Sequence, residues 1–379
     1  MASSSAGSAR TATSKTADIT HMRAALALAR RGLGSAWPNP AVGCVLVKDG
    51  RVVGRGWTQP GGRPHGETEA LQRAGASAKG ATAYVSLEPC CHWGKTPPCT
   101  DALIAAGVSR VVLPIEDPDP RVSGKGIAKL RDAGLAVDGG LCAEEAVEIN
   151  AGFFLRLREG RPLVTLKLAT TLDGQLATAT GESRWITGEL ARDRAHLLRA
   201  SHDAVMIGSN TVITDDPLLT CRLPGLDGRS PVRIILDSRL NVPLTARVVA
   251  EARQVPTWFI TLRHGDAARR EAFLSCGVEL IETRATPEHM VDIAAAFQEL
   301  GRRGLTRVLV EGGSTLAAVM LRAGLVDRLA WFHAPSLIGG DGIPAVAGFG
   351  LATLEKAPRF ERVGLEAIGE DVLETLRRR

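Results

Sequence analysis

The chain has 379 residues, of which 45% are hydrophobic and 4% aromatic, and 46 Lys and Arg stand against 41 Asp and Glu. This length and apolar content are enough for two domains with separate cores. The mild positive charge is dispersed and suits an anionic small molecule; without a basic stretch interleaved with aromatic residues, we expect no nucleic-acid partner. No apolar run approaches the roughly 18 residues of a membrane span, so we expect no membrane partner.

The cysteines and the N-terminal residues indicate the cellular compartment in which we expect the protein. The seven cysteines form no regular disulfide framework, and any that bind a metal have to stay reduced, so we expect a cytoplasmic protein. Residues 1–18 are rich in Ser, Ala and Thr and lack the apolar core of a signal peptide. We interpret them as a disordered tail, with a transit peptide as the weaker alternative.

The first half of the chain alternates helical and extended patterns. Asp18 or Thr20 can cap a first helix, and Asp49-Gly50 is a type I′ turn signal between two strand patterns. Further strands are predicted at 82–87, 110–114 and 135–137, and helices at 65–75, 101–107, 126–134 and 143–159. This alternation predicts an α/β layered sheet. We place the domain boundary after the last helix, which gives one domain over 19–160 and a second over 161–379.

Potential metal ligands lie within the first domain. His65, Cys90 and Cys99 offer one imidazole and two thiolates, which leaves the fourth position of a tetrahedral Zn²⁺ for water, as in a catalytic site. Glu67 is too close to His65 to ligate comfortably beside it, but it is well placed to carry protons from the activated water to a leaving amine. The pattern H-x-E with a later P-C pair is typical of zinc deaminases.

The two cysteines are further apart than in the deaminase signature P-C-x-x-C, because eight residues separate them. In the first interpretation Cys90 and Cys99 are the ligands, and the insert 93–98 forms part of the substrate pocket. In the second, Cys91 replaces Cys90, or His92 joins as a fourth ligand and closes a structural site. Because a proline precedes both Cys90 and Cys99, we favour the first. We expect the ligands to lie at two helix N-termini, whose partial positive charge favours thiolates.

The second half begins a new α/β pattern. Strands are predicted at 163–169, 203–208, 232–237, 257–260, 278–281 and 307–310, with a helix at 190–200. Gly312-Gly313 lies between a strand and a helix start, where free backbone N–H groups can hold a phosphate. There is no G-x-G-x-x-G pattern, so we do not expect a Rossmann dinucleotide domain.

Two sets of motifs resemble one known family. The first set is His65-Gly66-Glu67, Leu87-Glu88-Pro89-Cys90 and Gly94-Lys95-Thr96-Pro97-Pro98-Cys99. It resembles the deaminase half of the bifunctional deaminase/reductase family of riboflavin biosynthesis, in which the long cysteine spacing is usual. The second set is Leu166-Lys167-Leu168-Ala169, Leu172-Asp173-Gly174, 181–187, 211–220 and Val310-Glu311-Gly312-Gly313, and it resembles the reductase half. The resemblance covers nearly the whole chain after the tail.

The resemblance implies a fold and an activity. The fold is a cytidine-deaminase-like three-layer domain followed by a dihydrofolate-reductase-like α/β domain. The activity is zinc-dependent hydrolytic deamination of a diaminopyrimidinone ribosylamino phosphate, followed by NADPH reduction of the ribosyl side chain to ribitylamino. The protein is then both a hydrolase and an oxidoreductase, with Zn²⁺ on His65, Cys90 and Cys99 and with Glu67 as the catalytic residue. We also expect a homo-oligomer, either a dimer or a tetramer.

The resemblance further implies two sets of binding residues. Those expected to contact NADPH are Ala169, Trp185, Thr211, Asp215, Ser238, Gly313, Ser314 and Thr315. Those expected to contact the phosphorylated pyrimidine substrate are Asn39, Lys167, Ser183, Arg199, Leu219, Arg222 and Glu311. The residue types agree in kind, since Arg199 and Arg222 are suited to bidentate phosphate binding.

Two positions depart from the family pattern. Thr58 stands where the family commonly has His, which removes an imidazole near the pocket, and Gly66 stands where Ala is usual, at some cost to helix stability. Two other functions stay open at this point: a nucleic-acid base deaminase with a targeting module, and a binding protein with a structural zinc knot. The low aromatic content counts against the first, and the position of Glu67 counts against the second.

Overall fold

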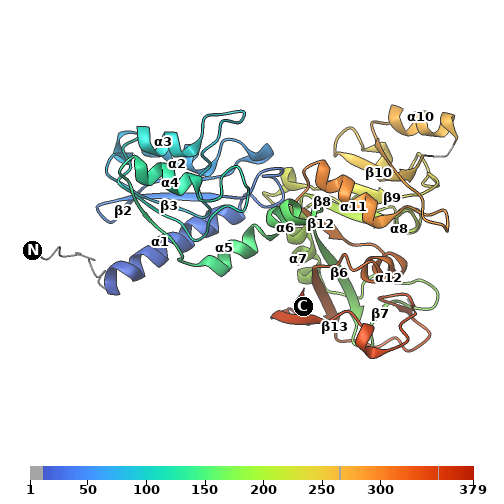
Figure 1. Ribbon diagram of the computed structural model, residues 1–379. Coiled ribbons are helices and arrows are strands. Elements are labelled where there is room, and N and C mark those ends of the chain that lie inside the picture. The colour runs from blue at the N-terminus through green and yellow to red at the C-terminus, as the bar shows by residue number, and fades with distance from the viewer. Residues whose placement is uncertain (1–11, 264–265, 349) are drawn as a thin grey trace, which may run out of the picture. The chain divides into compact units, whose positions relative to one another are not determined.

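The structure is a computed structural model that describes residues 12–263, 266–348 and 350–379. The chain divides into two compact units, one that ends at Leu157 and one from Arg158 to Arg379. Both units are α/β, as the sequence predicts (Figure 1). Within the described ranges, no helix is long and apolar enough to cross a membrane.

The first unit contains a sheet with the strand order β2-β1-β3-β4-β5. Its strands are β1 (Gly43–Lys48), β2 (Arg51–Trp57), β3 (Thr82–Val85), β4 (Arg110–Val112) and β5 (Ala136–Asp138). The strands β2 and β3 run antiparallel to β1, whereas β4 and β5 continue parallel to β3. At the turn between β1 and β2, Asp49 and Gly50 have φ values of 50° and 71°, and two positive φ angles are what the predicted type I′ turn requires.

Helices cover both faces of this sheet. They are α1 (Ala12–Arg30), α2 (Gly66–Ala74), α3 (Cys99–Ala105), α4 (Lys125–Asp132), α5 (Ala143–Ile149) and α6 (Ala151–Glu159). Alternate side chains of β1 enter two cores: Cys44 and Leu46 pack with α2, α3 and α4, whereas Val45 and Val47 pack with α1 and α5. In Figure 1, α1 and α5 accordingly lie on the opposite side of the sheet from α2, α3 and α4. This is the predicted three-layer architecture.

The N-terminal helix starts earlier than predicted. Residues 12–18 of the predicted disordered tail belong to α1, and the rest of that predicted tail lies outside the described residues. Asp18 is buried, accepts a hydrogen bond from the Tyr84 hydroxyl at 2.6 Å and pairs with Arg110 at 2.7 Å. These contacts hold the helix on the sheet, and they involve strands far from Asp18 in the sequence.

The predicted helix over 143–159 is two helices, α5 and α6, with a break at Asn150. The Asn150 side chain is buried; its Oδ1 accepts from the backbone N–H of Ala41 at 2.9 Å, and its Nδ2 donates to the Ala41 carbonyl at 3.1 Å. The Asn150 side chain at the break therefore holds the chain segment that leads into β1.

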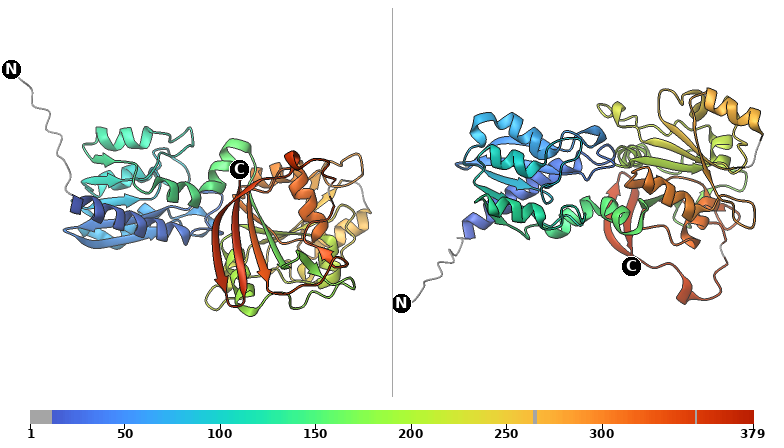
Figure 2. Two further views of the ribbon diagram at one scale, coloured as in Figure 1. Left: turned by 90° about the horizontal axis from the view of Figure 1, so that it is seen from below. Right: turned by 45° about the horizontal axis from the view of Figure 1, so that its top comes forward.

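The second unit contains a sheet with the strand order β11-β10-β9-β8-β12-β6-β13-β16-β15. Its strands are β6 (Leu163–Thr171), β8 (Ala204–Gly208), β9 (Val232–Leu236), β10 (Thr257–Leu262), β11 (Glu279–Thr283), β12 (Arg307–Val310), β13 (Arg328–Ala334), β15 (Phe360–Ile368) and β16 (Asp371–Arg378), and β7 (Gln175–Ala177) pairs separately with β14 (Ile343–Pro344). From β11 to β13 the neighbours are parallel, whereas β16 and β15 are antiparallel. These two long C-terminal strands, red in Figure 2, form one edge of the sheet.

The helices of the second unit connect its parallel strands. They are α7 (Glu189–Ala200), α8 (Ser209–Asp215), α9 (Arg247–Ala250), α10 (Ala267–Ser275), α11 (Ile293–Arg302) and α12 (Ser314–Arg322). Because β8, β9 and β12 are parallel neighbours, the segments that follow them meet at one edge of the sheet. In open α/β sheets ligands bind at the carboxyl ends of the strands, so this edge is where a cofactor site is expected.

Candidate active sites

Three predicted metal ligands lie together in the first unit. His65 is the N-cap of α2, Cys99 is the first residue of α3, and Cys90 lies in the loop after β3. The Nδ1 atom of His65 is 3.3 Å from Cys99 Sγ and 3.7 Å from Cys90 Sγ, and all three ligand atoms lie within 4.8 Å of one another. Ligands of tetrahedral zinc, at Zn–N and Zn–S distances near 2.0 to 2.3 Å, lie about 3.5 to 3.8 Å apart. The three side chains therefore fit a zinc ion.

Cys90 does not lie at a helix N-terminus, contrary to the prediction. The loop that contains it stays non-helical until α3 begins at Cys99. The backbone N–H of Cys99 nevertheless donates to Cys90 Sγ at 3.3 Å. The hydrogen bond from the Cys99 thiol lowers the pKa of Cys90, and the thiolate is the form of cysteine that binds a metal.

Glu67 lies in the first turn of α2, beside the three ligands. Its side chain is buried, and its Oε2 atom has no hydrogen-bond partner among the described residues. Burial raises the pKa of Glu67, because a carboxylate loses hydration there. A buried carboxyl group of this kind next to a metal site is suited to exchange protons with a water molecule on the metal.

The other two candidate ligands lie outside the cluster formed by the described residues. The Cys91 thiol donates to the Arg121 carbonyl at 3.6 Å. His92 lines the same cavity as Glu67, and its Nδ1 atom is buried without a hydrogen-bond partner in the part of the chain that the structure describes. This geometry agrees with the interpretation in which Cys90 and Cys99 are the ligands and a coordination position stays open.

A cavity of about 480 Å³ adjoins the metal ligands, and Asn39 and Thr58 line it. The Thr58 hydroxyl accepts from the Val42 N–H at 2.9 Å and donates to the Pro40 carbonyl at 3.0 Å. It is therefore bound to backbone and does not replace the imidazole that is common in the family. At Gly66 an added Cβ would lie 2.7 Å from the Val42 carbonyl oxygen. Glycine at this position therefore permits a close approach of two backbone segments, besides its predicted cost to helix stability.

The second unit contains a cavity of about 290 Å³ beside α7 and β6. Seven predicted residues line it: Lys167, Ala169, Ser183, Trp185, Arg199, Arg222 and Glu311. Among the lining residues that were not predicted, two are ionisable, Arg192 and His196. With Arg192 the lining has four cationic side chains and one carboxylate, which suits an anionic ligand.

Arg199 is engaged with Glu311 rather than free to bind a phosphate. Its Nε and Nη2 atoms donate to the two carboxylate oxygens at 2.6 and 2.8 Å, and its Nη1 atom donates to the Thr220 carbonyl at 3.0 Å. Burial by itself would raise the pKa of Glu311, but the Arg199 guanidinium outweighs that effect and lowers the pKa to about 2. The sequence analysis predicts bidentate phosphate binding by Arg199, whereas the bidentate partner of Arg199 in the structure is the buried carboxylate of Glu311. Arg222 remains largely available.

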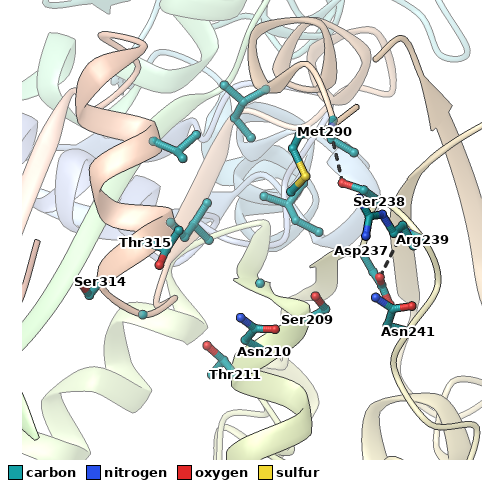
Figure 3. A pocket seen from close by; sticks show the side chains of 17 residues that line it. Ser209, Asn210, Thr211, Asp237, Ser238, Arg239, Asn241, Met290, Ser314 and Thr315 are labelled. Atoms are coloured by element: carbon teal, nitrogen blue, oxygen red, sulfur yellow. Dashed lines mark hydrogen bonds between the residues drawn. The ribbon is translucent and has the colours of Figure 1, made fainter. Parts of the chain in front are cut away.

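A third cavity, of about 420 Å³, lies at the carboxyl ends of β8, β9 and β12. Five predicted cofactor residues line it: Thr211, Ser238, Gly313, Ser314 and Thr315. Figure 3 shows Ser314 and Thr315 on one wall and Ser238 on the other, with Thr211 below them. Gly313 is the N-cap of α12 and has no side chain to cap it, which leaves the first-turn amides of this helix for an anion such as a diphosphate.

Two of the predicted cofactor and substrate contacts, Asp215 and Leu219, line none of these three cavities as the described residues form them. Asp215 is the exposed last residue of α8, and Leu219 is 2% exposed with a φ of 58°. The Leu219 side chain belongs to a hydrophobic core of the second unit, so only its backbone is available for a ligand.

The spacing of residues in the sequence could have identified Arg192 and His196, the two ionisable residues of the cavity beside α7 that were not predicted. Arg192, His196 and Arg199 follow one another at spacings of four and three residues, which places them on one face of a helix. The helix itself was predicted over 190–200, so the face could have been identified from Arg199 alone.

Comparisons with known proteins cover both units. Residues 15–115 match the family model of the cytidine and deoxycytidylate deaminase zinc-binding region, and residues 162–373 match that of the RibD C-terminal domain. Riboflavin biosynthesis protein RibD of Escherichia coli is 44% identical over 368 residues, which cover 94% of this chain and 98% of that protein. The RibD of Aquifex aeolicus is 44% identical over 356 residues, with coverages of 94% and 97%. The chain belongs to the RibD family.

Solved structures of RibD proteins agree with this assignment. RibD of Acinetobacter baumannii, form 1, superimposes with a TM-score of 0.85 at 37% identity, covering 96% of this chain and 99% of that chain. The deaminase/reductase of Thermotoga maritima gives a TM-score of 0.84 at 35% identity with the same coverages. The family resemblance, the two-domain α/β fold and the bifunctional activity are thereby confirmed: the protein is a zinc-dependent deaminase and NADPH-dependent reductase of riboflavin biosynthesis.

Proposed function

We propose that the first unit deaminates a diaminopyrimidinone ribosylamino phosphate and that the second unit reduces the ribosyl side chain of the product. The Thermotoga maritima relative is named as a diaminohydroxyphosphoribosylaminopyrimidine deaminase and 5-amino-6-(5-phosphoribosylamino)uracil reductase. The observation that carries the proposal is the grouping of His65, Cys90 and Cys99 around the buried Glu67. A cavity with an excess of cationic side chains in the second unit adds to it.

In the deaminase site, His65, Cys90 and Cys99 would hold zinc. When bound, zinc supplies a Lewis acid that makes a water molecule nucleophilic near neutral pH. The buried Glu67 carboxyl group beside the three ligands would carry a proton from the attacking water to the amino group that leaves as ammonia. The amide nitrogen of Asn39 lies 3.3 Å from His65 Nε2 and donates to the Gly62 carbonyl at 2.9 Å. The Asn39 side chain is therefore fixed beside a zinc ligand, where it would contact the pyrimidine ring of the substrate.

In the reductase site, the residues divide between two cavities. Thr211, Ser238 and the 313–315 turn hold the cofactor, which supplies a hydride when bound. Lys167, Ser183 and Arg222 contact the phosphorylated substrate, and Ala169 and Trp185 line the same cavity. Arg199 keeps Glu311 ionised, so the carboxylate can accept a hydrogen bond from a substrate hydroxyl or amine.

The decisive experiment for the deaminase site is Glu67→Gln in the full-length protein. Because Glu67 transfers protons and does not ligate, we expect this variant to keep its zinc and to lose ammonia release. It should still oxidise NADPH when it is supplied with the deaminated intermediate, and a chelator added to the wild type should reproduce this split. Loss of zinc in the variant would show that Glu67 is a ligand. Loss of both activities in a folded protein would contradict two separate sites.

We place the deaminase over residues 19–160 and the reductase over 161–379, in a cytoplasmic homo-oligomer. Support for association comes from β15 at the edge of the large sheet, where Val363 and Leu365 are 52% and 65% exposed. An unpaired edge strand with apolar side chains tends to pair with another chain. Sedimentation of the purified protein should give the mass of a dimer or a tetramer, and a monomer would contradict the proposal.

A further inference from the structure

The proposed cofactor cavity has one free charged side chain. Among the described residues that line it, Asp237 and Arg239 alone are ionisable, and both follow β9. Figure 3 shows them on the wall that also carries Ser238 and Asn241. These two residues therefore decide the electrostatic preference of this wall for a ligand.

Asp237 is unavailable to a ligand. It is 1% exposed, and its carboxylate accepts the backbone N–H of Val242 at 2.8 Å and that of Arg239 at 3.4 Å. In dinucleotide sites that prefer NAD, an acidic residue near the end of a strand binds the 2′-hydroxyl of the adenosine ribose and repels a 2′-phosphate. Here the acidic residue at that place is directed into the backbone of its own turn, so it neither binds the hydroxyl nor repels the phosphate.

Arg239, in contrast to Asp237, is available to a ligand. Its side chain is exposed at the cavity, and no hydrogen bond or ion pair holds its guanidinium among the described residues. The hydrogen bonds of Asp237 fix the backbone at Arg239, and the adjacent Ser238 hydroxyl accepts from the Val291 N–H at 3.2 Å. A guanidinium on a fixed turn, free of a carboxylate partner, is suited to bind a phosphate with two parallel hydrogen bonds.

The residues on the opposite wall of the cavity indicate which phosphate group of a dinucleotide Arg239 would bind. The N-terminus of α12 at Ser314 and Thr315 is suited to the diphosphate of a dinucleotide, and Figure 3 shows it across the cavity from Arg239. The proposed substrate cavity lies beside β6, and β8 and β12 separate β6 from β9 in the sheet. A nicotinamide ring that points toward the substrate cavity leaves the adenosine ribose on the side of β9. We infer that Arg239 binds the 2′-phosphate of the adenosine ribose and thereby makes the reductase select NADPH over NADH. This inference rests on the proposed placement of the cofactor in this cavity.

The test compares ligands that differ only by the 2′-phosphate. Binding of 2′,5′-ADP and of 5′-AMP to the full-length protein would be measured by calorimetry for the wild type, Arg239→Ala and Arg239→Lys. Arg322→Ala, which removes an exposed arginine at the other end of α12, is the matched control. The Michaelis constants for NADPH and NADH on the deaminated intermediate would be measured in parallel.

We expect Arg239→Ala to weaken 2′,5′-ADP binding about tenfold to a hundredfold, as the loss of one or two charge-assisted hydrogen bonds does. Binding of 5′-AMP should stay within about twofold of the wild type, and the preference for NADPH over NADH should fall with the loss of 2′,5′-ADP affinity. Arg239→Lys should recover part of the affinity, and Arg322→Ala should bind both ligands as the wild type does.

Two other results are informative in different ways. If Arg239→Ala weakened 2′,5′-ADP and 5′-AMP equally, or weakened neither, while the wild type bound 2′,5′-ADP, the cofactor site would stand and the selective role of Arg239 would be wrong. If the wild type failed to bind NADPH and Thr211 or Ser238 variants left NADPH oxidation unchanged, the proposed cofactor cavity itself would be wrong.

Discussion

Replacement of Glu311 by Gln should destabilise the reductase unit in a pH-dependent way. The Glu311 side chain is 8% exposed and pairs with Arg199 through two hydrogen bonds. Burial opposes ionisation, yet the pairing lowers the pKa of Glu311 from its usual 4.5 to about 2. At about 1.4 kcal/mol for each pKa unit, this difference is worth about 3 kcal/mol near neutral pH, which is a substantial part of the total stability of about 5 to 15 kcal/mol for a typical domain.

The sign of the pH dependence follows from the lowered pKa. A carboxyl group whose pKa is lower in the folded state stabilises the fold above its unfolded pKa and loses that contribution as the pH falls. For Glu311 the loss occurs between pH 4.5 and about 2. The wild type should therefore exceed Glu311→Gln by about 3 kcal/mol at neutral pH, and the difference should shrink as the pH falls below 4.5.

The assay is urea unfolding of the full-length protein, followed by tryptophan fluorescence at several pH values. The double-mutant cycle with Arg199→Met isolates the ion pair, because each single variant leaves one buried charge without its partner, whereas the double variant removes both charges. We expect the double variant to lose less unfolding free energy than the sum of the losses in the two single variants. The difference, which is the coupling energy, should be about 2 to 3 kcal/mol. Additive effects, or a loss below about 1 kcal/mol that does not change with pH, would refute the reasoning.

Two further predictions concern the zinc ligands and a buried arginine. Cys90→Ser and Cys99→Ser should each lose zinc, whereas Cys91→Ser should retain it, as metal analysis of the purified variants would show; retention in Cys90→Ser with loss in Cys91→Ser would reverse the ligand assignment. Arg233, whose side chain is fully buried, donates to the Thr257 hydroxyl and to three backbone carbonyls. Arg233→Met should lower the free energy of unfolding by about 3 to 5 kcal/mol, because these acceptors lose their donor, and an unchanged urea midpoint would contradict this role.

The sequence by itself determined the chemistry of the first site and the class of the fold. The ligand types and the position of Glu67 depend on local spacing, because residues two positions apart at a helix start have nearly fixed relative places. The type I′ turn at Asp49 and Gly50 and the alternation of strands and helices are likewise local, since backbone preferences and side-chain periodicity act over a few residues. The assignment of cofactor and substrate contacts came from the family resemblance rather than from these patterns.

The tertiary structure decided which polar side chains are free to act. Arg199 and Arg222 look alike in the sequence, but a buried carboxylate 112 positions away engages the first and leaves the second available. In the same way Asp237 is engaged by its own turn while Arg239 faces the cavity. Asp18 pairs with Arg110 of a distant strand, and residues 12–18 of the predicted tail belong to α1. Hydrogen bonds and burial between distant segments set these outcomes, because a buried charge must find a partner wherever the fold provides one. Local patterns contain no information about that partner.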